Sequence, residues 1–497
     1  MNLRTTTAAP LLETRSLVSG IACPKRLWWA THEPAARRSW SLLQDQLEAE
    51  AEIVKVLFRE RSPHGVQIGG DNEDARIAST RAAIDRGETL ILDGTLSSDS
   101  LVAQFGYLRQ TNDAWEVGAI APSTTVEPEL IRELAAQVYV LRSTGLVADK
   151  CTLVHLNPEC RYPDLDALFL EVDVTAAVEK ERPRILRQIF RIRRALKGPL
   201  PMIVPGDHCR RPRECLFLDR CAPEVRPDSL DKFVRMPRAQ VELLQAKGYQ
   251  WITELPDNYP LTLIQRRQQA AIARNRLVVE PTLRDALPEL SRSIAIVELH
   301  AVRPAVPIWT KCRPFEAVPG YITVLKMGVS GGSECGSEYR EWLSSGQEDP
   351  RAEAAEWLSE MIRGEESILM FDAERNLQQI RQLVRVAGCE SGFDALSQNR
   401  FDLQAILEEH VYDYAFLGSF ELLRCAEALV PDLYVGKGTT ADAGQLEPLL
   451  ARWMFGDLPT RERGALRQRL SEAGRTRSYL IGRVLNRLSE ICGAAKH

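Results

Sequence analysis

Apolar residues recur along the chain at the two spacings that mark amphipathic helices and half-buried strands. A helical period runs from residue 42 to 58, and a second one runs from 129 to 141. Strands are predicted where short apolar runs occur, at residues 90–94, 101–103, 115–120 and 152–157. This order predicts a sheet flanked by helices within a first region, which we place at residues 1–225.

The pattern changes after this region. Residues 226–290 are mainly helical, and residues 244–255 (LQAKGYQWITEL) fit either a single helix–hairpin–helix or a plain helical connector. Residues 291–497 again mix strands with helices. Strands are expected at 294–299, 321–327 and 367–371, and helices at 352–363, 377–387 and most of 447–495. The fold class predicted from the pattern is a multidomain α/β protein.

Composition fits a folded protein of two or three domains. The chain has 497 residues, of which 44% are hydrophobic and 26% charged, with a formal net charge of −5. No run of 18 apolar residues occurs, which argues against a membrane partner, and residues 1–10 show no secretory signal. We therefore expect a cytoplasmic location, where the eleven cysteines would not form disulfides.

The mild acidity conceals a basic segment. Residues 181–213 hold ten Arg or Lys against two acids. Helical spacing gathers four arginines on one face, namely Arg184, Arg187, Arg191 and Arg194. This face is either a solvated helix surface or a stripe that contacts phosphates. Lys25 and Arg26 are further candidates for nucleic-acid binding, and the sequence leaves the oligomeric state open.

Three cysteines stand at equal intervals in a loop rich in Pro and Arg, at Cys209, Cys215 and Cys221. Zinc and cubane iron–sulfur sites need four ligands, and Cys23, in ACPKRLWW, is the candidate fourth. The spacing is longer than the usual zinc knuckle, yet the residues alone leave zinc, iron–sulfur and unrelated thiols open. The other cysteines show no ligand spacing and are interpreted as structural: Cys151, Cys160, Cys312, Cys335, Cys389, Cys425 and Cys492.

Together these motifs carry a family resemblance. The chain resembles RecB-like nucleases with an iron–sulfur cluster, such as CRISPR-associated exonucleases and AddB-type helicase-nucleases. The residues that carry this resemblance are CPKRLW starting at Cys23, His208-Cys209, PREC ending at Cys215, and Cys221. The whole chain resembles an uncharacterised bacterial family that joins this PD-(D/E)XK domain, through a helical connector, to a DnaQ-like exonuclease domain.

The resemblance implies a fold and a cofactor. It implies a RecB-like restriction-endonuclease fold over 1–225, a helical connector over 226–290 and an RNase H-like (DnaQ-type) domain over 291–497. It also implies a 4Fe–4S cluster with four cysteine ligands, which are Cys23, Cys209, Cys215 and Cys221.

The first nuclease centre lacks its catalytic residues. The RecB-like pattern expects an Asp at the end of one strand, which in this comparison spans residues 101–108, and Glu-x-Lys on the next strand. Gly106 stands at the Asp position, and Ala119 and Ala121 stand at the Glu and Lys positions. Glu116 lies three residues early and should point to the opposite face of its strand. The family's Gln-x-Tyr is kept downstream, at Gln137 and Tyr139. We therefore predict an inactive first centre.

The second centre is altered as well. Glu298 and His300 replace the Asp-x-Glu of DnaQ-like enzymes, and Arg477 or its neighbours occupy the helix that should carry the last acid. Glu298, His300, Glu374 and Asp402 are weak candidates to hold Mg²⁺ or Mn²⁺. The alternative, which we favour, is that they are polar residues of a degenerate domain.

The leading hypothesis is therefore a nucleic-acid-binding or assembly protein derived from an iron–sulfur nuclease and without activity. By family inference it would act on DNA with protein partners, in repair or defence. An active Mg- or Mn-dependent exonuclease that uses a rearranged DnaQ-like site is one alternative, and an iron–sulfur redox sensor is another.

Overall fold

The computed structural model describes residues 11–34, 42–99, 101–203, 205–209, 215–221, 226–330, 333–334, 337–388, 399–430 and 443–494. The chain is a mixed α/β protein of two compact units. The first contains Met1–Pro223 and Pro304–Glu316, and the second contains Glu224–Arg303 and Ala317–His497. The segment 226–290 thus packs within the second unit, while the short segment 304–316 returns to the first.

The first unit is built on a six-stranded sheet of order β2-β3-β6-β7-β8-β9. Its strands are β2 (Val66–Gln67), β3 (Leu90–Leu92), β6 (Tyr107–Thr111), β7 (Ala114–Ile120), β8 (Ala148–Leu156) and β9 (Phe169–Asp173). β7 and β8 pair in parallel, because helix α5 (Pro128–Ser143) makes the crossover between them. A smaller sheet has the order β1-β5-β4, from β1 (Leu12–Glu13), β5 (Leu101–Gln104) and β4 (Thr95–Ser97).

One expected strand is broken. The sequence predicts a single strand over 101–108, but the chain leaves β5 at Gln104 and enters β6 at Tyr107 in the other sheet. Between them, the Phe105 amide donates to Gly94 and the Asp93 amide donates to Gly106. A Cβ at Gly106 would stand 2.9 Å from the Gly118 carbonyl oxygen, so the bend requires glycine there.

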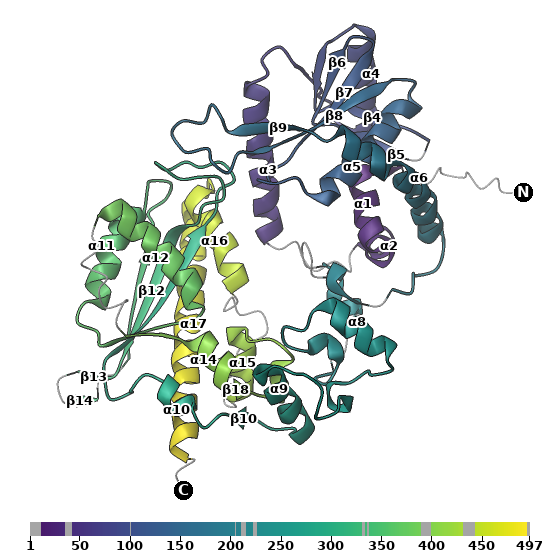
Figure 1. Ribbon diagram of the computed structural model, residues 1–497. Helices are drawn as coiled ribbons and strands as arrows, with labels where there is room; N and C mark the ends of the chain where they lie inside the picture. Colours follow the sequence, from purple (N-terminus) through teal and green to yellow (C-terminus); the bar gives the residue numbers. More distant parts are fainter. Residues whose placement is uncertain are drawn as a thin grey trace, which may run out of the picture. The chain divides into compact units, whose positions relative to one another are not determined.

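Helices cover the sheet of the first unit (Figure 1). The helices of this unit are α1 (Thr14–Ala22), α2 (Pro24–His32), α3 (Leu42–Glu60), α4 (Glu73–Asp85), α5, α6 (Thr175–Lys197) and the short α7 (Leu218–Cys221). Helices α1, α5 and α6 pack against one another and share one hydrophobic core with the strands. α6 contributes Val178, Ile185, Ile189 and Ile192 to that core, as its amphipathic spacing requires.

The second unit is built on a five-stranded sheet of order β15-β12-β11-β16-β17. The strands are β11 (Ile294–Val302), β12 (Val318–Met327), β15 (Glu338–Leu343), β16 (Ser367–Met370) and β17 (Arg400–Asp402). Counted along the chain, the order is third, second, first, fourth, fifth. β11 pairs antiparallel with β12 and parallel with β16.

Every residue of β11 is buried, because helices cover both faces of this sheet. On one face α11 (Arg351–Ile362) and α12 (Ala373–Ala387) pack on Ala295, Val297 and Leu299. α16 (Ala443–Phe455) and α17 (Thr460–Ala494) lie on the other side of β12 (Figure 1). β11, β12, β16 and the long C-terminal helices lie where the hydrophobic pattern predicts them, whereas the pattern does not predict β15 and β17.

Shorter elements complete the second unit. They are η3 (Leu230–Lys232), α8 (Arg238–Ala246), η4 (Ile252–Glu254), α9 (Leu263–Arg274), β10 (Val278–Val279), α10 (Leu283–Ala286), β13 (Val329–Ser330), β14 (Ser333–Glu334), α14 (Leu403–His410), β18 (Val411–Tyr412), η6 (Tyr414–Phe416) and α15 (Leu422–Leu429). The helix–hairpin–helix alternative does not form: the second helix is replaced by the single 3₁₀ turn η4, which ends before Pro256.

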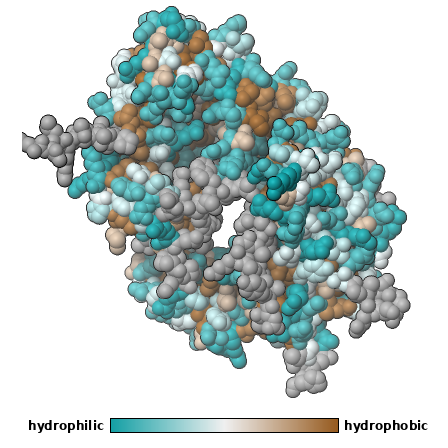
Figure 2. Space-filling view, turned by 180° about the vertical axis from the view of Figure 1, so that it is seen from behind, coloured by the Kyte–Doolittle hydropathy of each residue, from teal (hydrophilic) through white to brown (hydrophobic). Residues whose placement is uncertain are grey.

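Hydrophilic residues cover most of the face in Figure 2, and hydrophobic residues stand there in separate patches. Among the described residues, no helix has both the length and the apolar character needed to cross a membrane.

Candidate functional site

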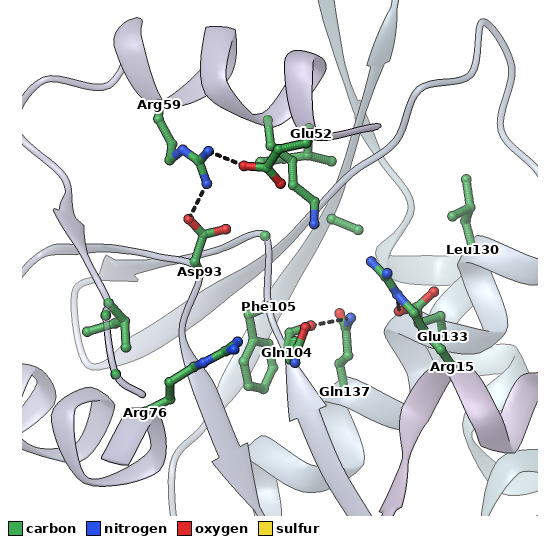
Figure 3. Close-up of a pocket in the computed structure, with 17 residues that line it drawn as sticks. Arg15, Glu52, Arg59, Arg76, Asp93, Gln104, Phe105, Leu130, Glu133 and Gln137 are labelled. Atoms are coloured by element: carbon green, nitrogen blue, oxygen red, sulfur yellow. Dashed lines mark hydrogen bonds and ion pairs between the residues drawn. The ribbon is translucent and has the colours of Figure 1, made fainter. Parts of the chain in front are cut away.

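A pocket of about 320 Å³ opens in the first unit at the position of the expected nuclease centre (Figure 3). Gly106 and Ala119 line it, as the motif alignment predicts, whereas Ala121 is buried outside the lining. The charged residues of the pocket come from four helices and one turn: Arg15 on α1, Glu52, Lys55 and Arg59 on α3, Arg76 on α4, Glu133 on α5, and Asp93 after β3.

Each carboxylate of this pocket already has a cationic partner. Arg59 bridges two of them, with its Nη1 2.7 Å from Asp93 Oδ2 and its Nη2 2.5 Å from Glu52 Oε1. Burial lowers the pKa of Arg59, but the hydrogen bonds to Glu52 and Asp93 outweigh burial and raise it. Arg15 Nε lies 3.0 Å from Glu133 Oε1. In this arrangement each of the three carboxylates of the pocket is engaged by an arginine.

Two cations and one amide oxygen of the pocket are left without partners. Neither Lys55 nor Arg76 forms an ion pair with a residue in the part of the chain that the structure describes. Gln137 Nε2 donates to the Gln104 carbonyl at 2.9 Å, while the buried Gln137 Oε1 accepts no hydrogen bond from the described residues. The pocket thus offers two positive charges and one acceptor to a ligand.

Glu116 lies on the other face of β7, as its position in the strand predicts. Its Oε1 accepts from the Tyr107 hydroxyl at 2.8 Å and from the Thr152 hydroxyl at 2.6 Å. Burial raises the pKa of Glu116, but these hydrogen bonds and the charges of Arg109 and Lys150 outweigh burial, so the pKa is lowered. Glu116 therefore acts within the fold and does not reach the pocket.

A second pocket, of about 210 Å³, lies in the second unit around Glu298 and His300. Arg477 Nε stands 2.6 Å from Glu298 Oε2, although the N–H direction does not meet hydrogen-bond geometry, so the contact is an ion pair. Burial raises the pKa of Glu298, and the charges of Arg477 and Arg375 oppose the rise. Arg477 lies on α17, the long C-terminal helix.

His300 is buried in the same pocket. Neither of its ring nitrogens has a hydrogen-bond partner among the described residues. Burial lowers the pKa of His300 well below its ordinary value, and the positive charges of Arg477 and Arg375 lower it further. The imidazole is therefore neutral at physiological pH.

The structure does not bring the four weak metal candidates together. Glu298 and His300 line the pocket, but Glu374 is exposed on α12 and accepts from Gln378. Asp402 is the N-cap of α14, and its side chain accepts from backbone amides of residues 373, 404 and 405. No group of three His, Cys, Asp or Glu with the separations of a metal site occurs among the described residues.

Of the four proposed cysteine ligands, Cys209 and Cys215 share one small cluster and Cys23 interacts with them electrostatically, but among the described residues they do not form a group with the separations of a metal site. Cys23 is the N-cap of α2, and Cys209 and Cys215 pack together with Phe217. Burial raises the pKa of Cys23 and of Cys215, and the charge of Cys209 raises both further. Cys221 is half-buried at the end of α7. All the cysteines that the structure describes are free thiols, while Cys335 and Cys389 lie outside the described residues.

Buried side-chain nitrogens without hydrogen-bond partners in the described part of the chain accompany these thiols. Arg26 Nε, Trp29 Nε1 and His208 Nε2 are buried and find no hydrogen-bond partner in the described ranges. Trp29 packs against the Cys209 and Cys215 cluster, His208 precedes Cys209, and the charge of Arg26 lowers the pKa of Cys215 against the larger effect of burial. Thiolate or sulfide acceptors would satisfy such donors.

Arg26, a predicted nucleic-acid contact, is half-buried. Its Nη2 donates to the Ser19 carbonyl at 3.1 Å, and its charge lowers the pKa of Cys23 against the larger effect of burial. Lys25 is half-buried on the same helix. The four arginines of α6 are exposed on one face, as predicted: Arg184, Arg187, Arg191 and Arg194. Three further basic residues of that segment, Arg210, Arg211 and Arg213, lie outside the described residues.

Sequence reasoning missed the residues that close the first pocket. A signal was present, because Glu52, Lys55 and Arg59 follow a helical spacing on the predicted helix and Asp93 ends a predicted strand. Their meeting depends on how α3 lies on the sheet, which no local pattern specifies.

Comparison with known proteins gives limited information. Residues 297–421 match a family described as Domain of unknown function (DUF2779). No curated protein matches the chain. A solved structure described as "Crystal structure of SSO0001" is similar over 44% of this chain and 90% of that chain, at 12% identity and a TM-score of 0.23. This TM-score is too low for an inference about fold or function.

Proposed function

We propose that this chain is a nucleic-acid-binding protein with the architecture of an iron–sulfur nuclease, and that arginines have replaced the metal ions of both former centres. The observation that carries the proposal is the first pocket, where Arg59 and Arg15 pair with all three carboxylates while Lys55 and Arg76 form no ion pair with a described residue.

Metal-dependent cleavage needs free carboxylate oxygens around Mg²⁺ or Mn²⁺. In the pocket, a cation would have to displace Arg59 from Asp93 and Glu52 and then tolerate Lys55 and Arg76 nearby. A phosphate group, in contrast, matches two unpaired cations and gains charge-assisted hydrogen bonds from them. Binding without cleavage is the chemistry that these side chains favour.

The second unit supports the same interpretation. Its strand order and its antiparallel first pair are those expected of an RNase H-like sheet, and Arg477 stands beside Glu298. In the first unit, the crossover of α5 between the parallel strands β7 and β8 is compatible with a RecB-like fold. In this proposal the protein therefore has both nuclease folds and neither nuclease activity.

An iron–sulfur cluster fits the cysteine region. Cys23, Cys209, Cys215 and Cys221 would hold it, and the partnerless N–H groups of Arg26, Trp29 and His208 would face its sulfurs. When bound, such a cluster supplies a covalent staple that adds folding free energy without taking part in cleavage. The staple would fix the start of α2, whose Trp28 Nε1 donates to the Gly198 carbonyl at the end of α6.

DNA binding by the pocket can be tested by fluorescence anisotropy in EDTA with 5′-labelled single- and double-stranded oligonucleotides. We expect the wild type to bind and the variant Lys55→Ala with Arg76→Ala to bind at least about tenfold more weakly, because two phosphate contacts are lost. Arg81→Ala is the matched control, since Arg81 is exposed on the same helix as Arg76 but outside the pocket.

The same samples test activity. With Mg²⁺ or Mn²⁺ added, we expect no cleavage of either substrate. Metal-dependent cleavage that Asp402→Ala or Asp93→Ala abolishes would overturn the inactive-nuclease proposal, and a wild type that binds no nucleic acid would overturn the binding proposal.

The cofactor has a separate test. Anaerobically purified protein should be brown and contain iron and sulfide, and Cys209→Ser should lose both. Cys492→Ser is the control, because Cys492 is half-buried near the end of α17 and is not one of the four proposed ligands. Colourless wild-type protein with stoichiometric zinc would refute the iron–sulfur assignment.

A further inference from the structure

The exposed face of α6 carries an aromatic residue among its cations. Phe190 is 76% exposed although it is a large hydrophobic residue in the middle of a helix. With Arg191, Arg194 and Lys197 it lines an open hollow of about 860 Å³, which continues over the loop at Gly198, Pro199 and Pro201. Phe190 is not needed for the core, because Ile185, Ile189 and Ile192 already pack there.

Helical geometry places this phenylalanine on the arginine side of the helix. At 3.6 residues per turn, Arg187, Phe190, Arg191, Arg194 and Lys197 fall within an arc of about 120°, opposite the buried isoleucines. Arg187, Arg191, Arg194 and Lys197 form no ion pair with any residue that the structure describes, whereas Arg184 is paired with Glu181 at 3.2 Å. The free positive charge is therefore concentrated around the phenylalanine.

The hollow stands on a rigid support. α2 packs against α6, and the Trp28 indole donates a 3.0 Å hydrogen bond to the Gly198 carbonyl just after α6 ends. Trp28 itself stacks on His32 with ring centroids 4.3 Å apart. Because the C-terminal end of α6 is already held by these contacts, binding a ligand there costs less conformational entropy than ordering a mobile loop would.

We infer that this surface binds single-stranded nucleic acid, with a base stacked on Phe190 and the neighbouring phosphates on Arg187, Arg191, Arg194 and Lys197. Charge complementarity selects this occupant, since four unpaired cations surround one exposed ring. Proteins that bind single strands combine a basic groove with aromatic side chains, and each stacked base contributes about 1–3 kcal/mol. The bases of a duplex are already stacked on one another, so the ring would favour single strands. The inference rests on the proposed function and names its substrate class.

The test compares Phe190→Ala with Phe190→Trp in EDTA, using a labelled oligothymidine and a duplex of the same length. The stacking magnitude predicts that Phe190→Ala weakens single-strand binding by about 5- to 150-fold, while duplex binding stays unchanged and Phe190→Trp keeps the wild-type affinity. Arg191→Glu should flatten the salt dependence of single-strand binding, which Phe190→Ala should leave unaltered. Leu263→Ala is the control for removal of an exposed apolar side chain, because Leu263 is 79% exposed on α9.

The outcomes separate this inference from the proposed function. If Phe190→Ala binds single strands as the wild type does while the Lys55 and Arg76 variant binds weakly, the α6 inference fails and the proposed function stands. If Phe190→Ala weakened single-strand binding and duplex binding equally, the stacking of a base on Phe190 would be overturned. A change in oligomeric state by light scattering, with DNA affinity intact, would assign the hollow to a protein contact and overturn the inference. A wild type that binds neither substrate would overturn the proposed function itself.

Discussion

The two pockets place an arginine on an acidic residue in different surroundings. In the first unit, the side chains of Arg59, Asp93 and Glu52 are 19%, 26% and 57% exposed, so water screens their attraction. In the second unit, the side chains of Arg477 and Glu298 are 9% and 3% exposed. The contact between a guanidinium and a carboxylate is therefore partly exposed to water in one unit and belongs to the buried core in the other.

The sharpest test of this difference removes the buried cation. Arg477→Met leaves the buried Glu298 carboxylate without its partner, and we expect the free energy of unfolding to fall by about 3–5 kcal/mol. Urea unfolding followed by circular dichroism measures this loss.

A second variant isolates the cause. Replacing both residues, Glu298→Leu with Arg477→Met, removes the stranded charge, so the double variant should recover to within about 1 kcal/mol of the wild type. A double variant as unstable as Arg477→Met alone would show that packing around α17, and not the charge, determines the loss.

The sequence predicts more of the second pocket than of the first. The pattern locates β11 and the C-terminal helix, and it indicates that Arg477 or a neighbour replaces an acid. It does not predict that Arg477 contacts Glu298, since the two are far apart in sequence and α17 must first pack on the sheet.

The pH dependence of stability should also differ between the pockets, because of His300. Burial, followed by the charges of Arg477 and Arg375, keeps the pKa of folded His300 well below its ordinary value. Below about pH 6.5 the unfolded chain binds a proton at His300 but the folded chain does not. The contribution of His300 to the free energy of unfolding is therefore fully present above that pH and is lost as the pH falls. The slope from this one group is about 1.4 kcal/mol per pH unit.

We therefore expect His300→Gln to lose that slope between about pH 5 and 6. Unfolding in urea at several pH values measures it. His64→Gln is the control, because His64 is exposed in the first unit. An unaltered slope in His300→Gln would contradict the buried, neutral imidazole.

Local pattern predicts the helices and the arginine face of α6, because the 3.6-residue period alone determines which side chains share a face. It fails where the chain changes sheets. The expected strand over 101–108 breaks at Phe105 and Gly106, since β5 and β6 find partners in different sheets. Asp93, whose side chain lines the pocket, lies in the turn after β3 with a φ of 56°. The tertiary fold, and not the local sequence, determines this backbone conformation.

The smallest effect on stability is expected in the first pocket. Arg59→Met should reduce the free energy of unfolding by no more than about 1 kcal/mol, because its ion pairs are partly exposed to water. The same variant frees Asp93 and Glu52, which then face the pocket as unpaired oxygen ligands. Mn²⁺ binding, measured by electron paramagnetic resonance, should therefore appear in Arg59→Met and be absent from the wild type. A loss of stability as large as that of Arg477→Met would show that Arg59 also belongs to the core, and the distinction between the two pockets would fail.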